Sequence, residues 1–199
     1  AVQPFGGEDC DIEALYFDRD PNYGGNVYIA LIASYNPEGS GFPNPPEWVG
    51  DMKITLGSDE YGIVMTDHNG LTQGQVYKNP GWIVSEHTGG YYICLGEPYR
   101  IDHNHPGALN GNVNTIVFNT TCLQDDYGYG NYVVEFSAPK TAFDSNANSG
   151  NLGVTIWCGN DRIDLEGVTF EVPEFTTIAI PVCMILGLFY FFRRKRQNE

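Results

Sequence analysis

The stretch Asn131–Ala138, NYVVEFSA, decides the fold. Apolar side chains, Val134, Phe136 and Ala138, alternate with a more polar set, Val133, Glu135 and Ser137. Because successive side chains of a strand point to opposite faces, this alternation predicts a strand with one buried and one solvated face. Sheets of that kind are usually antiparallel. We therefore expect an antiparallel sheet around this segment.

Similar runs, rich in β-branched and aromatic residues, recur along the chain with turn residues between them. We expect strands at 27–35, which also fits a short helix, and at 52–57, 62–66, 75–85, 89–96, 114–123, 152–158 and 163–172. Ser58–Tyr61 is expected to connect a hairpin, and Asn79–Gly81 to form a turn or bulge. Segments 103–114 and 144–151 read as polar loops, whereas 8–18 fits a short helix or a strand. The pattern predicts an all-β fold of about nine strands, an antiparallel sandwich or a stacked-sheet β-arch domain.

The charge of the chain is strongly negative and unevenly placed. Four of the 10 basic residues are Arg193–Arg196, so residues 1–174 hold six basic and 24 acidic residues, a net charge of −18. Such a surface repels nucleic acid and anionic headgroups, and it attracts cations. Solubility in a salty habitat accounts for the same balance.

Four of the five cysteines lie in the polar part of the chain, and Cys183 lies in the apolar tail. The four are Cys10, Cys94, Cys122 and Cys158. Their wide spacing without a CxxC pair argues against a zinc ribbon and allows two disulfides in three pairings. Such disulfides could form within one subunit or between subunits, and they require an oxidising compartment. Reduced, buried thiols are the alternative.

Candidate ligand sites are sparse. Asp18, Asp20 and Asn22 alternate in a short loop, as hard oxygen ligands for calcium do, although the positions that complete an EF-hand hold Tyr23 and Ile29. A polar turn explains these three residues equally well.

Two histidines and three tryptophans offer further options. His103 and His105 flank Asn104 beside Asp102, a spacing that allows a shared metal on a strand, although a solvated loop also fits. The tryptophans, Trp48, Trp82 and Trp157, could stack on carbohydrate or fill a sandwich core. No nucleophile elbow, HExxH, P-loop or GxGxxG occurs, so we expect no enzyme. Asn119 opens an NTT glycosylation sequon.

The C-terminal tail differs from the rest of the chain. Residues 175–192 carry no charge and would form a helix of about 27 Å, enough for a thin bilayer. The basic cluster at 193–196 marks the cytoplasmic side, which places residues 1–174 outside the cell. A core helix is the alternative. The small residue Ala1 in place of Met fits an end left by signal-peptide cleavage.

The tail also resembles the PEF-CTERM sorting signal of archaeal surface proteins, known especially from methanogens. The resemblance lies in the order of an acidic motif, an apolar span and a basic cluster: Pro173, Glu174, Phe175, Thr177–Ala179, Pro181, Ile185–Leu188, Arg193, Arg194, Lys195 and Arg196. It implies processing by an archaeosortase-like membrane enzyme near 173–175 and transfer to a membrane anchor. We therefore divide the chain into an exported β-rich domain, 1–172, and a sorting signal, 173–199.

Two functions of the exported domain fit these features. One is a structural subunit of an archaeal sheath or surface layer that self-associates through strand edges, in an amyloid-like manner for segments such as 89–96 and 131–138. The other is a cell-surface adhesin or carbohydrate-binding sandwich. We expect no nucleic-acid partner and no cofactor other than a calcium ion.

Overall fold

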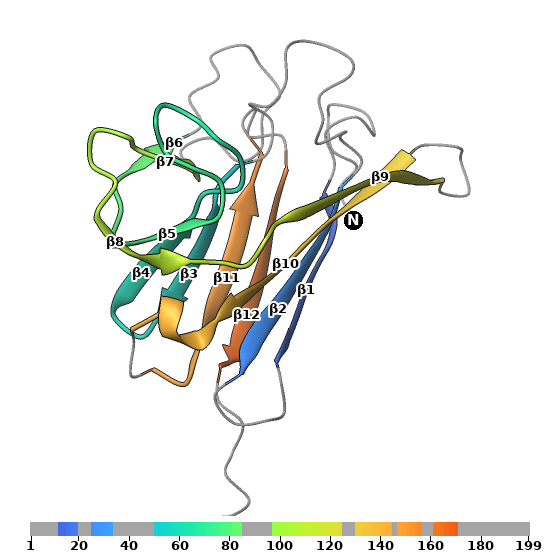
Figure 1. Ribbon diagram of the computed structural model, residues 1–199. Helices are drawn as coiled ribbons and strands as arrows, with labels where there is room; N and C mark the ends of the chain where they lie inside the picture. Colours follow the sequence, from blue (N-terminus) through green and yellow to red (C-terminus); the bar gives the residue numbers. More distant parts are fainter. Residues whose placement is uncertain are drawn as a thin grey trace, which may run out of the picture.

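The computed structural model describes residues 12–19, 25–33, 50–84, 97–124, 130–144, 147–156 and 161–170. These residues form twelve β-strands and one short 3-10 helix, and all the strand pairings are antiparallel (Figure 1). The all-β prediction is confirmed, with more strands than the nine expected. The expected C-terminal helix, 175–192, and the expected strand 89–96 lie outside the described residues.

Two sheets contain ten of the strands. Sheet A has the order β1-β2-β10-β9. Its strands are β1 (Ile12–Arg19), β2 (Asn26–Ala33), β9 (Val117–Gln124) and β10 (Gly130–Pro139). Sheet B has the order β12-β11-β3-β4-β5-β8. Its strands are β3 (Met52–Leu56), β4 (Asp59–Ile63), β5 (Gln75–Lys78), β8 (Ala108–Asn112), β11 (Ser149–Thr155) and β12 (Arg162–Thr169).

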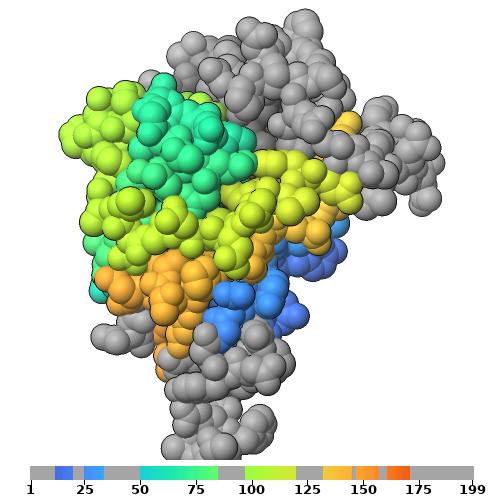
Figure 2. Space-filling view, in the orientation of Figure 1, coloured from blue at the N-terminus to red at the C-terminus, as the bar shows by residue number. Residues whose placement is uncertain are grey.

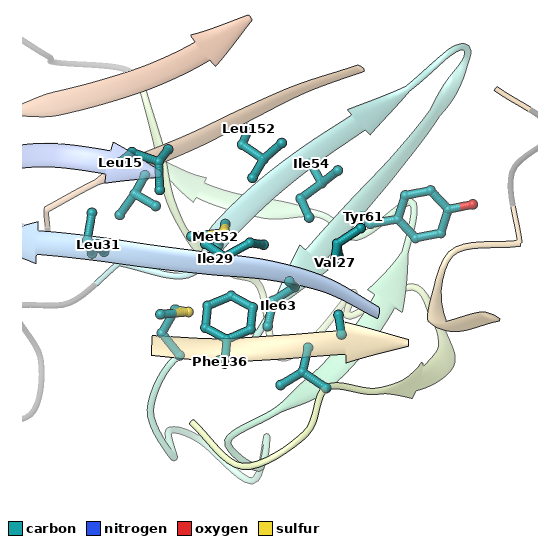
Figure 3. Close-up of a cluster of buried hydrophobic side chains, with 14 of the residues drawn as sticks. Leu15, Val27, Ile29, Leu31, Met52, Ile54, Tyr61, Ile63, Phe136 and Leu152 are labelled. Atoms are coloured by element: carbon teal, nitrogen blue, oxygen red, sulfur yellow. The ribbon is translucent and has the colours of Figure 1, made fainter. Parts of the chain in front are cut away.

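The main core lies between these two sheets, so the fold is a sandwich. Leu15, Leu31 and Phe136 project from sheet A toward Ile54 and Leu152 of sheet B (Figure 3). Alternate residues of β2 and β10 are buried, as the NYVVEFSA pattern predicts. Burial of a leucine or phenylalanine contributes about 1.5–3 kcal/mol, which makes this layer the main source of stability.

The two long sides of the sandwich differ. On one side β1 meets β12, where Arg19 donates to the Thr169 carbonyl at 3.2 Å and the Ile12 amide donates to Asp161 at 2.7 Å. On the other side the chain passes from β8 of sheet B to β9 of sheet A. The amide of Asn114 donates to the Ser137 carbonyl at 2.7 Å in this crossing. The edges β8 and β9 are thus joined by a short covalent link.

A small hairpin covers part of the outer face of sheet B. It consists of β6 (Trp82–Val84) and β7 (Pro98–Ile101). Its buried residue Ile101 forms a second apolar cluster with Val64, Leu71 and Tyr77. A side chain at Gly62 would place its Cβ 2.7 Å from the Ile101 Cδ1 atom, so the Ile101 side chain would have to shift to admit any larger residue there.

The structure corrects two predicted connections. Gly57 has a φ of +61°, and Leu56 pairs with Asp59, so the β3–β4 hairpin turns through two residues. Residues 59–61, predicted as part of the turn, belong to β4 because a tight turn that begins with glycine extends both strands.

The second correction concerns segment 103–114, predicted as a loop. It contains β8, which pairs with β5 although its sequence is poor in strand-forming residues. Asn110 donates to the Ala142 carbonyl at 2.7 Å, next to the 3-10 helix Lys140–Ala142. Tertiary contacts therefore stabilise this strand against its local preference. The strand β7 was not predicted, and the expected strand 75–85 divides into β5 and β6 at Asn79–Gly81.

Replacement of Leu31 by Ala tests the core between the sheets. Leu31 is fully buried, so Leu31→Ala should lower the free energy of unfolding by about 2–5 kcal/mol. The matched control is Leu109→Ala on β8, where the leucine is 57% exposed. Urea denaturation followed by circular dichroism measures both, and equal losses in the two variants would contradict the assigned core.

Candidate functional site

A shallow groove lies on the outer face of sheet A. It has a volume of roughly 610 Å³ and crosses all four strands, which lie side by side in Figure 2. The pairing register places Tyr16, Ala30, Glu135 and Val117 in one row across the sheet. The small Ala30 side chain lies between Tyr16 and Glu135 in this row, which leaves the sheet hollowed there.

A second row of the groove holds Asp18, Tyr28 and Ser137. The tyrosines, Tyr16 and Tyr28, are 57% and 46% exposed, and Val117 is 53% exposed. Exposed large apolar side chains that cluster on one face commonly mark an interaction site. Two carboxylates accompany them, and no lysine or arginine is found among the described residues that line the groove. The groove is therefore both aromatic and acidic.

The edge formed by β8 and β9 has an unusual composition. From His103 to Gln124 the chain holds no Asp, Glu, Lys or Arg, although it has 35 such residues in all. The edges on the other side are charged, with Glu13, Asp18 and Arg19 in β1 and Arg162, Asp164 and Glu166 in β12. Charges on edge strands oppose pairing with other chains, so β8 and β9 are the less protected edges.

A smaller polar groove of roughly 160 Å³ lies on the outer face of sheet B. Arg162 forms ion pairs with Glu97 and, at 2.7 Å, with Asp164. Lys53 pairs with Glu60. Three of its charged side chains, Lys53, Arg162 and Asp164, thus have ion-pair partners, which makes this groove the weaker candidate for binding.

A buried carboxylate organises the region around the hairpin. Asp51 is 1% exposed and accepts hydrogen bonds from the amides of Met65 at 3.0 Å and Ile101 at 2.8 Å. The His68 Nε2 atom lies 2.8 Å from Asp51 Oδ2, the oxygen that also accepts from the Ile101 amide. The His68 Nδ1 atom has no hydrogen-bond partner in the described part of the chain. Burial of both side chains favours a structural role for this pair.

A second charged cluster surrounds Tyr61. The Tyr61 hydroxyl donates to Asp144 at 2.7 Å, and Lys78 donates to the same carboxylate oxygen at 2.9 Å and lies 3.2 Å from Asp59. Burial of the phenol, with the hydrogen bond to Asp144 and its negative charge, raises the pKa of Tyr61 to about 12. Hydrogen bonds from Lys78 and Tyr61 lower the pKa of Asp144.

The predicted calcium ligands are only partly described. Asp18 lies at the exposed end of β1 and accepts a hydrogen bond from the Arg19 amide at 2.7 Å, while Asp20 and Asn22 lie outside the described residues. Calcium binding there stays a prediction. No cluster of three or more metal-ligating side chains occurs within the described ranges.

The predicted histidine pair lies in a surface turn. The Nδ1 atom of His105 lies 2.9 Å from Asp102 Oδ2, whereas His103 Nδ1 is 4.0 Å from the other Asp102 oxygen. The hydrogen bond with His105 is the main cause that lowers the pKa of Asp102. Asp102 also accepts from the Asn104 amide at 2.9 Å, so the carboxylate closes this turn.

The other predicted site residues divide between described and undescribed parts. Trp82 is half-buried against the hairpin cluster and donates its indole N–H to Glu60, which leaves it poorly placed as a sugar platform. Asn119 is exposed on β9, opposite Val133. Trp48, Trp157, Cys10, Cys94 and Cys158 lie outside the described residues, as does the side chain of Cys122.

The sequence analysis missed Tyr16, Tyr28 and the groove between them. A signal was present in the sequence. Each tyrosine occupies a position of its strand, β1 or β2, that alternates with buried residues and should therefore face solvent. Only the register of β1 on β2 places them near each other, in neighbouring rows of one face.

Comparison with known proteins identifies the tail. Residues 172–196 match the PEF-CTERM archaeal protein sorting domain. The match spans the predicted motif at 173–175 and the basic cluster at 193–196. It supports an exported, surface-sorted archaeal protein that an archaeosortase-like enzyme processes and anchors at the membrane. No curated protein and no solved structure matches the chain. Among the described residues no helix is long and apolar enough to cross a membrane.

Removal of the Asp51 carboxylate should be severely destabilising. Asp51→Ala leaves the buried amides of Met65 and Ile101 and the His68 ring without their acceptor, so we expect a loss of about 3–5 kcal/mol in the free energy of unfolding. The control is Asp67→Ala, which removes one exposed acceptor of the Gln73 amide and should cost about 1 kcal/mol or less. Urea denaturation compares the two, and similar losses would refute the assigned role of Asp51.

The pKa of Tyr61 predicts a loss of stability in alkali. Its folded-state pKa of about 12 lies above the ordinary value of 10.0, so its contribution is complete below pH 10 and is lost as the pH rises through 12. Lys78, whose pKa is raised mainly by its hydrogen bond to Asp144, acts in the same direction. In urea denaturations between pH 9 and pH 12, Tyr61→Phe should weaken this pH dependence. Tyr28→Phe, on the exposed face of sheet A, is the control, and an unchanged profile in Tyr61→Phe would contradict the prediction.

Proposed function

We propose that the chain is a non-enzymatic structural subunit of an archaeal cell envelope, a sheath or surface layer, and that it self-associates through strand edges. The sorting domain at 172–196 supports delivery to the cell surface. The antiparallel sandwich supplies strand edges that another copy can pair with. A subunit of this kind requires no catalytic site.

The observation that carries the proposal is the uncharged edge β8–β9. The edge strand β9 pairs on one side with β10, and among the described residues no strand pairs with its other side. The edge strand β8 likewise pairs only with β5. Natural sheets usually protect such edges with charges, so their absence over a stretch of this length favours pairing between copies.

The charge of the rest of the molecule bears on when assembly occurs. Residues 1–174 carry 24 acidic against six basic residues, so copies repel one another at low salt. Salt or divalent cations screen this repulsion. Assembly through β8–β9 is therefore expected to increase with ionic strength, as suits a subunit that must stay soluble during export.

Positive charges on the uncharged edge should prevent this assembly. The double variant Leu109→Lys/Asn119→Lys places one lysine on β8 and one on β9, at exposed positions. Analytical ultracentrifugation of the full chain in amine-oxide detergent, at low and high salt, should show salt-dependent oligomers for the parent chain. At each salt concentration the association constant of the double variant should be at least about tenfold lower than that of the parent chain, because edge lysines disfavour strand pairing.

The matched control adds the same total charge to the opposite edge. Thr169→Lys/Glu166→Gln changes two exposed residues of β12 and also makes the chain more positive by two units. It should assemble like the parent chain. If both double variants lose assembly equally, net charge and not the β8–β9 edge controls association. A parent chain that stays monomeric at high salt and with calcium would refute self-association.

A second candidate function is carbohydrate binding by a cell-surface adhesin. One specific observation favours it, the aromatic groove on sheet A with exposed Tyr16 and Tyr28. The groove meets the β8–β9 edge at Val117 and otherwise lies mainly on the other strands of sheet A, so the two functions do not exclude each other.

A further inference from the structure

We propose that the groove on the outer face of sheet A binds an uncharged, hydroxyl-rich polysaccharide, with Tyr16 and Tyr28 as its stacking surfaces. The inference rests on the cell-surface location proposed above, where such polymers occur, and does not require self-association. Its support comes from the arrangement of the rings, the hollow at Ala30 and the polar groups beside them.

The two tyrosines lie on adjacent strands in neighbouring rows. Tyr16 pairs with Ala30, and Tyr28 pairs with Asp18, so the rings are diagonal neighbours on one face of the sheet. Diagonal neighbours in a sheet lie about 7–8 Å apart, within reach of each other's aromatic side chains. Two phenol rings at this spacing suit the C–H faces of consecutive sugar rings, because the electron-rich face of a phenol attracts such hydrogen atoms.

Ala30 gives the groove its depth. It lies between Tyr16 on β1 and Glu135 on β10 in the same row, and its methyl group is much smaller than either neighbour. A row of large, small and large side chains leaves a hollow at the small residue. The hollow runs into the next row, where Tyr28 lies between Asp18 and Ser137.

The polar groups of the groove suit hydroxyl groups. The carboxylates of Asp18 and Glu135 accept hydrogen bonds, and the hydroxyl of Thr115 both donates and accepts. A few convergent polar groups beside an apolar surface are typical of ligand sites. Because the described lining has two carboxylates and no cation, phosphate, sulfate and uronic acid polymers are disfavoured.

The same charges argue against a second copy of the chain as the occupant. If the groove packed against itself across a two-fold axis, the carboxylates of Asp18 and Glu135 would face like charges at the centre of the interface. Burial of unpaired like charges costs several kcal/mol, and interface centres are depleted of charged residues. A neutral hydroxylated polymer carries no such cost.

Retention on insoluble polysaccharides tests the proposal. The full chain, in amine-oxide detergent without a sugar headgroup, is mixed with cellulose, chitin, mannan or polygalacturonate, and bound and free protein are measured. We expect retention on at least one of the three neutral polymers and none on polygalacturonate. Tyr16→Ala or Tyr28→Ala should weaken the binding at least about tenfold, since a tenfold change equals about 1.4 kcal/mol and an aromatic contact supplies about that much.

Ala30→Leu provides a second test that removes no contact. It fills the hollow and should abolish binding, whereas Tyr16→Phe keeps the ring and should retain most of it. Leu109→Ala, on β8 outside the groove, is the control for loss of an exposed apolar side chain. Leu109→Lys should bind like the parent chain even where it weakens assembly, which separates this proposal from self-association. Circular dichroism spectra and urea midpoints confirm that each variant is folded.

Three outcomes would overturn the proposal. The first is no retention on any of the neutral polymers. The second is retention that Ala30→Leu and both tyrosine variants leave unchanged. The third is tighter binding to polygalacturonate than to the neutral polymers at low salt. If the parent chain binds none of the polymers and the tyrosine variants lose salt-dependent association, the groove contacts a second copy instead.

Discussion

The buried carboxylate of Asp51 determines how one face of the sandwich is covered. It lies immediately before β3 and joins the end of β4, through Met65, to the hairpin strand β7, through Ile101. A carboxyl group in an apolar interior is tolerated only when hydrogen-bond partners surround it. These partners come from segments far apart in the sequence, so the site is complete only after the hairpin has docked on sheet B. The hairpin then buries Gly62 and creates the second apolar cluster.

The covered face makes the two outer surfaces of the sandwich chemically different. On sheet B the hairpin covers part of the face, and the groove beside it contains the ion pairs of Arg162. On sheet A, among the described residues, no comparable element packs on the outer face, and Tyr16 and Tyr28 remain exposed. Exposure of these rings lowers solubility, so the acidic residues Asp18 and Glu135 among them have a physical purpose even without a ligand.

The sequence was sufficient for the fold class, because its strongest signals are local. Alternation at Asn131–Ala138 reports one buried face, and the structure confirms burial of Val134, Phe136 and Ala138. Strand β8 could not be predicted in this way, since its stability comes from β5 and from Ala142, which are distant in the sequence. The candidate groove also depends on non-local information. Whether Tyr16 lies beside Ala30 is decided by strand register, and a shift of one residue would turn it to the core.

The geometry of sheet A links the two proposed activities, self-association and polysaccharide binding. Strand β9 is both an edge of sheet A and the border of the groove through Val117. Pairing of β9 with β9 of another copy would extend sheet A into one continuous sheet, with both grooves on it. Two weak sugar sites held in one rigid assembly act at a high effective concentration and bind a long polymer more tightly than either site alone. Assembly through the uncharged edge would therefore strengthen polysaccharide binding without any new contact to the sugar.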